Sequence, residues 1–258
     1  MSRNDQDSNG VVSNQTRRGV HMAKHERALH RIHPAQASLP IVKRQLARLQ
    51  DCLRQLQADQ IADVAERLWD VARLGGQIIV AGNGGSAATA SHMALDLGKS
   101  TLGGARRRVA FRIRTVALND AGPVITAWAN DHGYDRVFAE QIVTLARPGD
   151  AAVFCSVSGN SPNIVAAARA ARSIGTVVIA LLGRPGGVMR DLADLAVVVP
   201  SEDYQIVEDA HLAISHMVTR YLMKAMASAA APPRGDGSAE RRQAARAARP
   251  GNARKRRK

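Results

Sequence analysis

Aromatic side chains are scarce in this chain. Phe, Trp and Tyr make up 3% of the 258 residues, whereas hydrophobic residues as a whole make up 45%. The core must therefore consist mainly of Ala, Val, Leu and Ile, as in folds where helices pack closely on a sheet. The scarcity also argues against nucleic-acid recognition by base stacking, because that requires aromatic platforms.

Cysteines and long apolar segments are also few. Cys52 and Cys155 lie far apart in apolar periodic segments, so we expect both to be buried free thiols, as suits a reducing cytoplasm. No uninterrupted apolar stretch approaches the ~18 residues of a membrane helix, and the polar amino terminus lacks the apolar core of a signal peptide. We therefore expect a soluble, cytoplasmic protein without a membrane partner.

Positive charge is concentrated at one end of the chain. The formal net charge is +14, and more than half of the excess lies in residues 229–258. This Arg-rich tail is expected to be disordered and solvated, and the alternative is weak, nonspecific contact with nucleic acid. Residues 1–38, which are polar and lack apolar periodicity, are expected to form a disordered leader. Its histidines lack the neighbouring ligands of a metal site and are expected to be solvated: His21, His25, His30 and His33.

Two helices are predicted before the first strand. Ser38-Leu-Pro40 is a suitable helix start, because Pro is tolerated in the first turn. A second helix is predicted over 59–74 and ends at Gly75-Gly76. The first helix carries a narrow apolar seam, which favours packing between subunits over packing on its own domain. The seam consists of Val42, Leu46, Leu49, Leu53 and Leu56.

From residue 77 onward, short apolar segments alternate with helical ones. The predicted strands are 77–81, 113–118, 151–157, 176–182 and 195–199. The predicted helices are 86–99, 120–129, 135–146, 161–174, 186–193 and 204–227. Nearly continuous apolar strands are typical of a sheet covered on both faces, and the alternation indicates right-handed crossovers. We expect one α/β domain over 39–228, with a doubly wound five-stranded parallel sheet and an amino-terminal helical extension.

The segment Gly82-Asn-Gly-Gly-Ser86 joins the first predicted strand to a helix. Glycines allow a ligand to approach the backbone, and the free N–H groups at the helix start, with the Ser86 hydroxyl, favour phosphate or polyhydroxyl oxygens. The segment has neither the Lys of a P-loop nor the spacing of a dinucleotide fingerprint. The alternative is a tight turn that uses glycine for its geometry alone.

A second polar loop, Ser156-Val-Ser-Gly-Asn-Ser161, follows the third predicted strand. Three hydroxyls and the start of the next helix suit a bound anion, although serines are also common in turns and caps. Ligands of parallel sheets collect at the carboxyl ends of the strands, where both loops lie. Together the two loops predict a phosphate or phosphosugar ligand.

These two loops and the intervening Asn130-Asp-His-Gly-Tyr134 resemble the sugar isomerase (SIS) domain family, and are most similar to its phosphoheptose isomerases. The resemblance covers roughly residues 41–227. It implies a homotetramer with bundled amino-terminal helices that isomerises sedoheptulose 7-phosphate. The alternative is a noncatalytic SIS module that binds a phosphosugar or associates with the bacterial replication initiator.

The resemblance also implies the residues of the site. Phosphate would be held by Ser156, Ser158 and Ser161. The rest of the substrate would be held by Asn83, Gly84, Gly85, Ser86, Asn130, Asp131 and Glu208. A possible zinc ion would be held by His92, Asp96, Glu208 and His216. The last three of these, Asp96, Glu208 and His216, would also serve as the acid and base groups.

Helical spacing is compatible with this set. His92 and Asp96 are four residues apart and share a helix face, while Glu208 and His216 are eight apart, about 80° around the axis. This chain differs from the phosphoheptose isomerases at two of these positions: it has Asp96 where they have Glu, and Glu208 where they have Gln. The shorter Asp96 favours a binding module, since displacing a base by about 1 Å can cost ~100-fold in rate. Retention of both histidines favours an enzyme, and His211 is a spare candidate for orienting Glu208.

Overall fold

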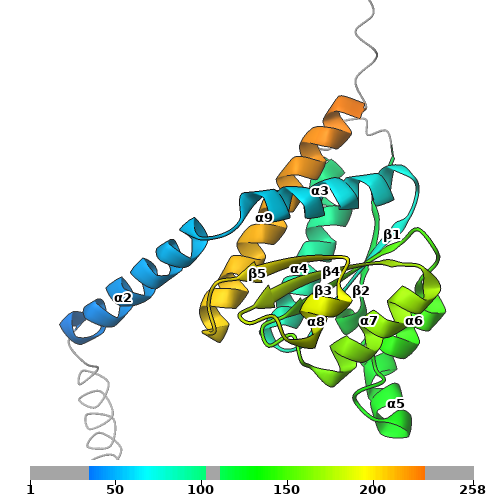
Figure 1. The fold of residues 1–258 in the computed structure, drawn as a ribbon, viewed down its shortest axis with the longest axis horizontal. Helices are drawn as coiled ribbons and strands as arrows, with labels where there is room; N and C mark the ends of the chain where they lie inside the picture. The colour runs from blue at the N-terminus through cyan, green and yellow to red at the C-terminus, as the bar shows by residue number, and fades with distance from the viewer. Residues whose placement is uncertain (1–34, 103–110, 230–258) are drawn as a thin grey trace, which may run out of the picture. The chain divides into compact units, whose positions relative to one another are not determined.

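The computed structural model describes residues 35–102 and 111–229 (Figure 1). These residues divide into two compact units, with the boundary after Asp51. The predicted leader up to residue 34, with its four histidines, and the predicted Arg-rich tail from residue 230 lie outside the described residues. The extent of the SIS domain proposed over 39–228 stays a prediction.

The second unit contains a five-stranded parallel sheet with the order β2-β1-β3-β4-β5. Its strands are β1 (Gln77–Gly82), β2 (Arg114–Ala117), β3 (Ala151–Ser156), β4 (Val177–Gly183) and β5 (Leu195–Val199). Each predicted strand agrees with the observed one to within one residue at either end. The expectation of complete cover on both faces is wrong for β2 and β5, because these strands form the sheet edges and are partly exposed.

Helices cover both faces of the sheet, which confirms the doubly wound arrangement (Figure 1). One face is covered by α3 (Ala58–Arg73), α4 (Gly85–Gly98) and α9 (Tyr204–Ala229). The other is covered by α6 (Ala139–Leu145), α7 (Pro162–Ile174) and α8 (Gly187–Leu192). Phe138 and Phe154 are buried in an otherwise aliphatic core, in line with the aromatic-poor composition.

Some helix ends differ from the prediction. Helix α2 (Ala35–Arg54) begins before Ser38, so the predicted start there is wrong; Pro40 lies inside the helix, where it removes one backbone hydrogen bond. Helix α6 begins at Ala139 rather than at residue 135, because a turn closed by the Arg136 N–H and the Gly133 carbonyl (3.1 Å) precedes it. The predicted helix 120–129 is displaced and is α5 (Gly122–His132). Two short 3-10 helices are present at Ser100–Leu102 and Leu118–Asp120.

Both described cysteines are buried and free, as predicted. Burial raises the pKa of the Cys155 thiol to about 12, so this thiol stays protonated and unreactive at neutral pH. Among residues 35–102 and 111–229, none of the helices has both the length and the apolar character needed to cross a bilayer.

His211 is a titratable side chain in the core. It lies on α9 with none of its surface exposed. Burial penalises the charged imidazolium and lowers the pKa of His211 to about 4, although the nearby Leu182 backbone works in the opposite direction to a smaller extent. The folded protein therefore holds this histidine neutral at pH values where an exposed histidine is charged.

Acid should destabilise the protein through His211. The unfolded side chain takes up a proton near its ordinary pKa of ~6.5, whereas the folded one does so only near pH 4. Because the unfolded state binds more protons between these values, this contribution to the free energy of unfolding is complete above pH 6.5 and is lost as the pH falls toward 4. The loss amounts to roughly 3 kcal/mol in total.

Chemical denaturation at pH 7 and pH 4.5 checks this expectation. His211→Gln should be less stable than the wild type at pH 7, and should lose less stability between the two pH values. His132→Gln, at an exposed position at the end of α5, is the matched control and should keep the wild-type dependence. Equal pH dependence in the wild type and His211→Gln would contradict the assignment.

Candidate active site

The two polar loops leave neighbouring strands at the same edge of the sheet. β1 and β3 pair in parallel, with Gly82 opposite Cys155. The side chains of Asn83 and Asn163 then join the loops through two reciprocal amide hydrogen bonds, each 2.9 Å long. The Tyr134 hydroxyl donates to the same Asn83 carbonyl oxygen at 3.3 Å. The predicted side-by-side placement of the loops is confirmed.

Hydrogen bonds within the second loop leave its serine hydroxyls able to donate. Ser156 Oγ accepts the Gly159 N–H at 3.1 Å, and Ser158 Oγ accepts the Asn160 N–H at 3.2 Å. Since each oxygen is already an acceptor, its own hydrogen remains for a ligand oxygen. Ser161 stands at the N-cap of α7 without a side-chain capping bond. The loop therefore offers several donors to an anion.

A cavity of about 90 Å³ lies between the two loops and the start of α9. The predicted residues that line it are Asn83, Ser86, Ser156, Ser158, Ser161 and Glu208. Cys155, Val157 and Tyr204 complete the lining. The cavity is small and rich in hydroxyl groups, as a site for a phosphate group requires.

Glu208 lies directly against the first loop. A side chain at Gly85 would overlap the Glu208 carboxylate, so the absence of a Cβ at residue 85 permits this contact. The contact joins the first turn of α4 to the first two turns of α9, which pack together. Glu208 thus belongs to the cavity between the loops.

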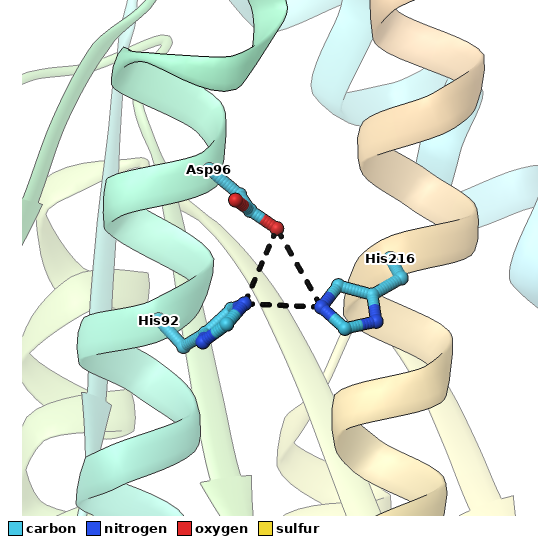
Figure 2. A group of neighbouring side chains, drawn as sticks. All are labelled: His92, Asp96 and His216. Carbon is cyan, nitrogen blue, oxygen red and sulfur yellow. Dashed lines mark hydrogen bonds and ion pairs between the residues drawn. The ribbon is translucent and has the colours of Figure 1, made fainter.

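Three other side chains converge farther along the same two helices (Figure 2). His92 and Asp96 come from α4 and His216 comes from α9. The Nε2 atoms of the two imidazoles are 3.0 Å apart, and Asp96 Oδ2 lies 3.5 Å from that of His92 and 3.7 Å from that of His216. Asp96 Oδ1 accepts the Ser100 hydroxyl at 2.8 Å, which fixes the orientation of the carboxylate. Although Asp96 is one methylene shorter than Glu, it reaches both rings.

The spacing of these three atoms suits a zinc ion. Zn–N and Zn–O bonds of about 2.0–2.2 Å at tetrahedral angles give ligand-to-ligand distances of roughly 3.3 Å. The three observed separations, from 3.0 to 3.7 Å, bracket that value. Two imidazoles and a carboxylate are also an ordinary zinc ligand set. Alternatively, one imidazole donates a hydrogen bond to the other.

Other predicted site residues lie apart from this group. The helical rise puts Glu208 about 12 Å from His216 along α9, so the described chain brings three of the four predicted metal ligands together. Asn130 and Asp131 are exposed at the end of α5 and bond to each other at 2.8 Å, and they do not line the cavity. His211 is buried in the core rather than in the cavity lining.

Sequence reasoning missed three supporting residues. Asn163 is buried in the loop-to-loop bond, Tyr134 bonds to Asn83, and Ser100 orients Asp96. The position of Asn163 in the first turn after a Ser-rich loop was the available signal. Its partner lies 80 residues away, which no local pattern indicates.

Comparisons with known proteins agree with this geometry. The SIS domain family model matches residues 43–183. A phosphoheptose isomerase from Pelobacter propionicus is 40% identical over 167 residues, which cover 64% of this chain and 85% of that protein. A phosphoheptose isomerase from Chlorobaculum parvum is 38% identical over 181 residues, covering 70% of this chain and 85% of that protein.

A solved structure extends the agreement to three dimensions. The phosphoheptose isomerase of Neisseria gonorrhoeae superposes with a TM-score of 0.67 at 28% sequence identity, covering 74% of this chain and all of that one. The five-stranded sheet, the flanking helices and the two polar loops therefore have a common explanation: the chain belongs to the SIS domain family, among relatives of the phosphoheptose isomerases.

Proposed function

We propose that the protein is an aldose–ketose isomerase that converts sedoheptulose 7-phosphate into a heptose 7-phosphate. The names of its relatives support this substrate. The observation that carries the proposal is that the hydroxyl-rich cavity and the His–Asp–His group lie along one pair of helices, α4 and α9.

The two parts are suitably spaced for one substrate. Gly85 faces Glu208 at one level, and His92 meets His216 seven or eight residues farther along each helix. With a rise of 1.5 Å per residue, the levels are about 10–12 Å apart. An extended seven-carbon sugar phosphate has a comparable length, so its phosphate can occupy the serine cavity while its carbonyl end reaches the histidines.

The phosphate end requires donors, which the second loop offers. The hydroxyls of Ser156, Ser158 and Ser161 would hold the phosphate oxygens. Glu208 would accept hydrogen bonds from sugar hydroxyls near the first loop, since a carboxylate is an acceptor. Its distance from His216 favours this role over that of the base or of a zinc ligand.

The carbonyl end requires a base and an acid. Isomerisation removes a proton from the carbon beside the carbonyl and protonates the carbonyl oxygen to give an enediol. The other enediol hydroxyl then loses its proton to become the new carbonyl, while the former carbonyl carbon gains one. Asp96 would remove the proton, and His216 would supply one to the oxygen, because the two side chains lie 3.7 Å apart. A zinc ion held by His92, Asp96 and His216 would supply Lewis-acid polarisation of the carbonyl in place of the His216 proton, because an Nε2 atom that binds zinc carries none.

Removing the base or the acid should abolish turnover. We expect Asp96→Asn and His216→Gln each to lower kcat on sedoheptulose 7-phosphate by at least ~100-fold, the effect typical of losing a general acid or base. Asp63→Asn, at an exposed position on α3, is a matched charge-removal control and should keep wild-type activity. A coupled assay and exchange of solvent deuterium into the sugar provide two readouts. Wild-type protein without turnover or exchange would indicate the noncatalytic SIS module instead.

The zinc assignment has its own measurement. Elemental analysis of protein loaded with zinc and desalted should find close to one ion per chain, and His92→Ala or His216→Ala should lose it, because two ligands remain. Glu208→Ala should retain the ion if the three-residue site is correct. Retention of zinc by both histidine variants would place the ion elsewhere.

We also propose a homotetramer formed through α2, in the cytoplasm where a metabolic isomerase meets its substrate. Within the unit that ends at Asp51, Val42 and Leu46 are 51% and 55% exposed, which suits an apolar seam that packs against another subunit.

Light scattering after size-exclusion chromatography tests the assembly. The wild type should have the mass of four chains, and the double variant Val42→Asp with Leu46→Asp should dissociate into smaller species, because it places charges in a helix–helix contact. Lys43→Asp changes an exposed residue beside the seam and should leave the mass unchanged. A monomeric wild type would contradict the proposal.

A further inference from the structure

The turn after β4 lies against the outer side of the serine loop. The Gly183 N–H donates to the Val157 carbonyl, and the Met189 N–H donates to the Gly159 carbonyl, each at 3.0 Å. Between these two bonds, residues 184–186 form the turn that joins β4 to α8, and Gly187 and Val188 are the first two residues of that helix. The loop that lines the cavity is therefore supported by backbone from the next crossover of the sheet.

Two glycines allow the loop and the turn to approach this closely. Gly159 has a φ of +63°, and a Cβ there would overlap the Gly186 carbonyl oxygen. Gly187 has a φ of +55°, and a Cβ there would lie 2.6 Å from Asn160 Oδ1. Because both positions combine a left-handed backbone with the absence of space, the two segments interlock.

Asn160 connects the turn to a serine hydroxyl. The side-chain oxygen of Asn160 accepts the Val188 N–H at 2.9 Å, and the backbone N–H of Asn160 donates to Ser158 Oγ at 3.2 Å. The first bond fixes Asn160 on the start of α8, and the second fixes the Ser158 oxygen. Asn160 itself is exposed and is not among the residues that line the cavity.

We propose that Asn160 is a positioning residue for the phosphate-binding loop. Its hydrogen bond from the Val188 N–H at the start of α8, here called the latch, holds Ser158 in the orientation that donates to the phosphate. The inference rests on the proposed function and adds a determinant of phosphate affinity outside the cavity. A loop that is held in its binding conformation before the ligand arrives avoids the ordering cost at the moment of binding. Releasing the latch should therefore weaken binding of the phosphate without changing the groups at the carbonyl end.

Two variants release the latch from opposite sides. Asn160→Leu keeps a similar side-chain volume but removes the acceptor for the Val188 N–H, and Gly187→Ala forces the turn away from Asn160. We expect each to raise KM for the sugar phosphate about tenfold and to change kcat by less than about twofold, since a neutral hydrogen bond typically contributes this much to affinity. Gln60→Leu, which replaces an exposed amide on α3, should leave KM unchanged.

Three further measurements make the outcome decisive. Calorimetry with inorganic phosphate should show weaker binding in both latch variants, and amide exchange at Val188 should be faster. The melting temperature should stay near that of the wild type in Asn160→Leu and should fall in Gly187→Ala, because a side chain is strained at a φ of +55°. Unchanged phosphate affinity, or an equal fall in kcat and melting temperature with KM unaltered, would overturn the proposal. Wild-type protein that binds phosphate without turnover would refute the isomerase, while the phosphate and exchange data would still decide the latch. Wild-type protein without phosphate affinity would overturn both.

Discussion

Two hydrogen bonds between the amide groups of Asn83 and Asn163 hold together the two polar loops at one edge of the sheet. Each amide is both donor and acceptor, so the pair satisfies polar atoms that would otherwise be costly where Asn163 is buried. Parallel pairing of β1 and β3 brings the two loops to the same edge, but strand pairing alone does not fix where each loop turns. The amide pair fixes this, and the hydroxyl-lined cavity depends on it.

Helices α4 and α9 run parallel and connect the cavity to the His–Asp–His group. On α4, residues 85, 92 and 96 are separated by seven and four positions, so they lie on nearly the same side of the helix. On α9, Glu208 lies against Gly85 and His216 lies against His92. The helix pair thus carries Glu208 at the end beside the cavity and the two imidazoles farther along, in fixed order, while the serine hydroxyls of the cavity come from the loop after β3.

Local sequence patterns predicted most of the fold and part of the site. Apolar runs located all five strands, because buried parallel strands tolerate few polar residues, and the glycines after residue 74 marked the end of α3. The start of α6 was missed because Val137 and Phe138 are apolar residues of a buried turn rather than of a helix. The family resemblance supplied the polar residues in groups, but it put Glu208 both with the residues of the loops and with the histidines. Whether Glu208 joins the histidines or the serines depends on the register between two helices, which is set by packing across more than a hundred residues.

The contact between Gly85 and Glu208 restricts how this surface can change during evolution. A side chain at residue 85 would occupy the volume now filled by the carboxylate, so the flexible Glu208 side chain would have to turn away from the first loop. A larger residue at position 85 would therefore remove the carboxylate from the lining of the cavity even where Glu208 itself is kept.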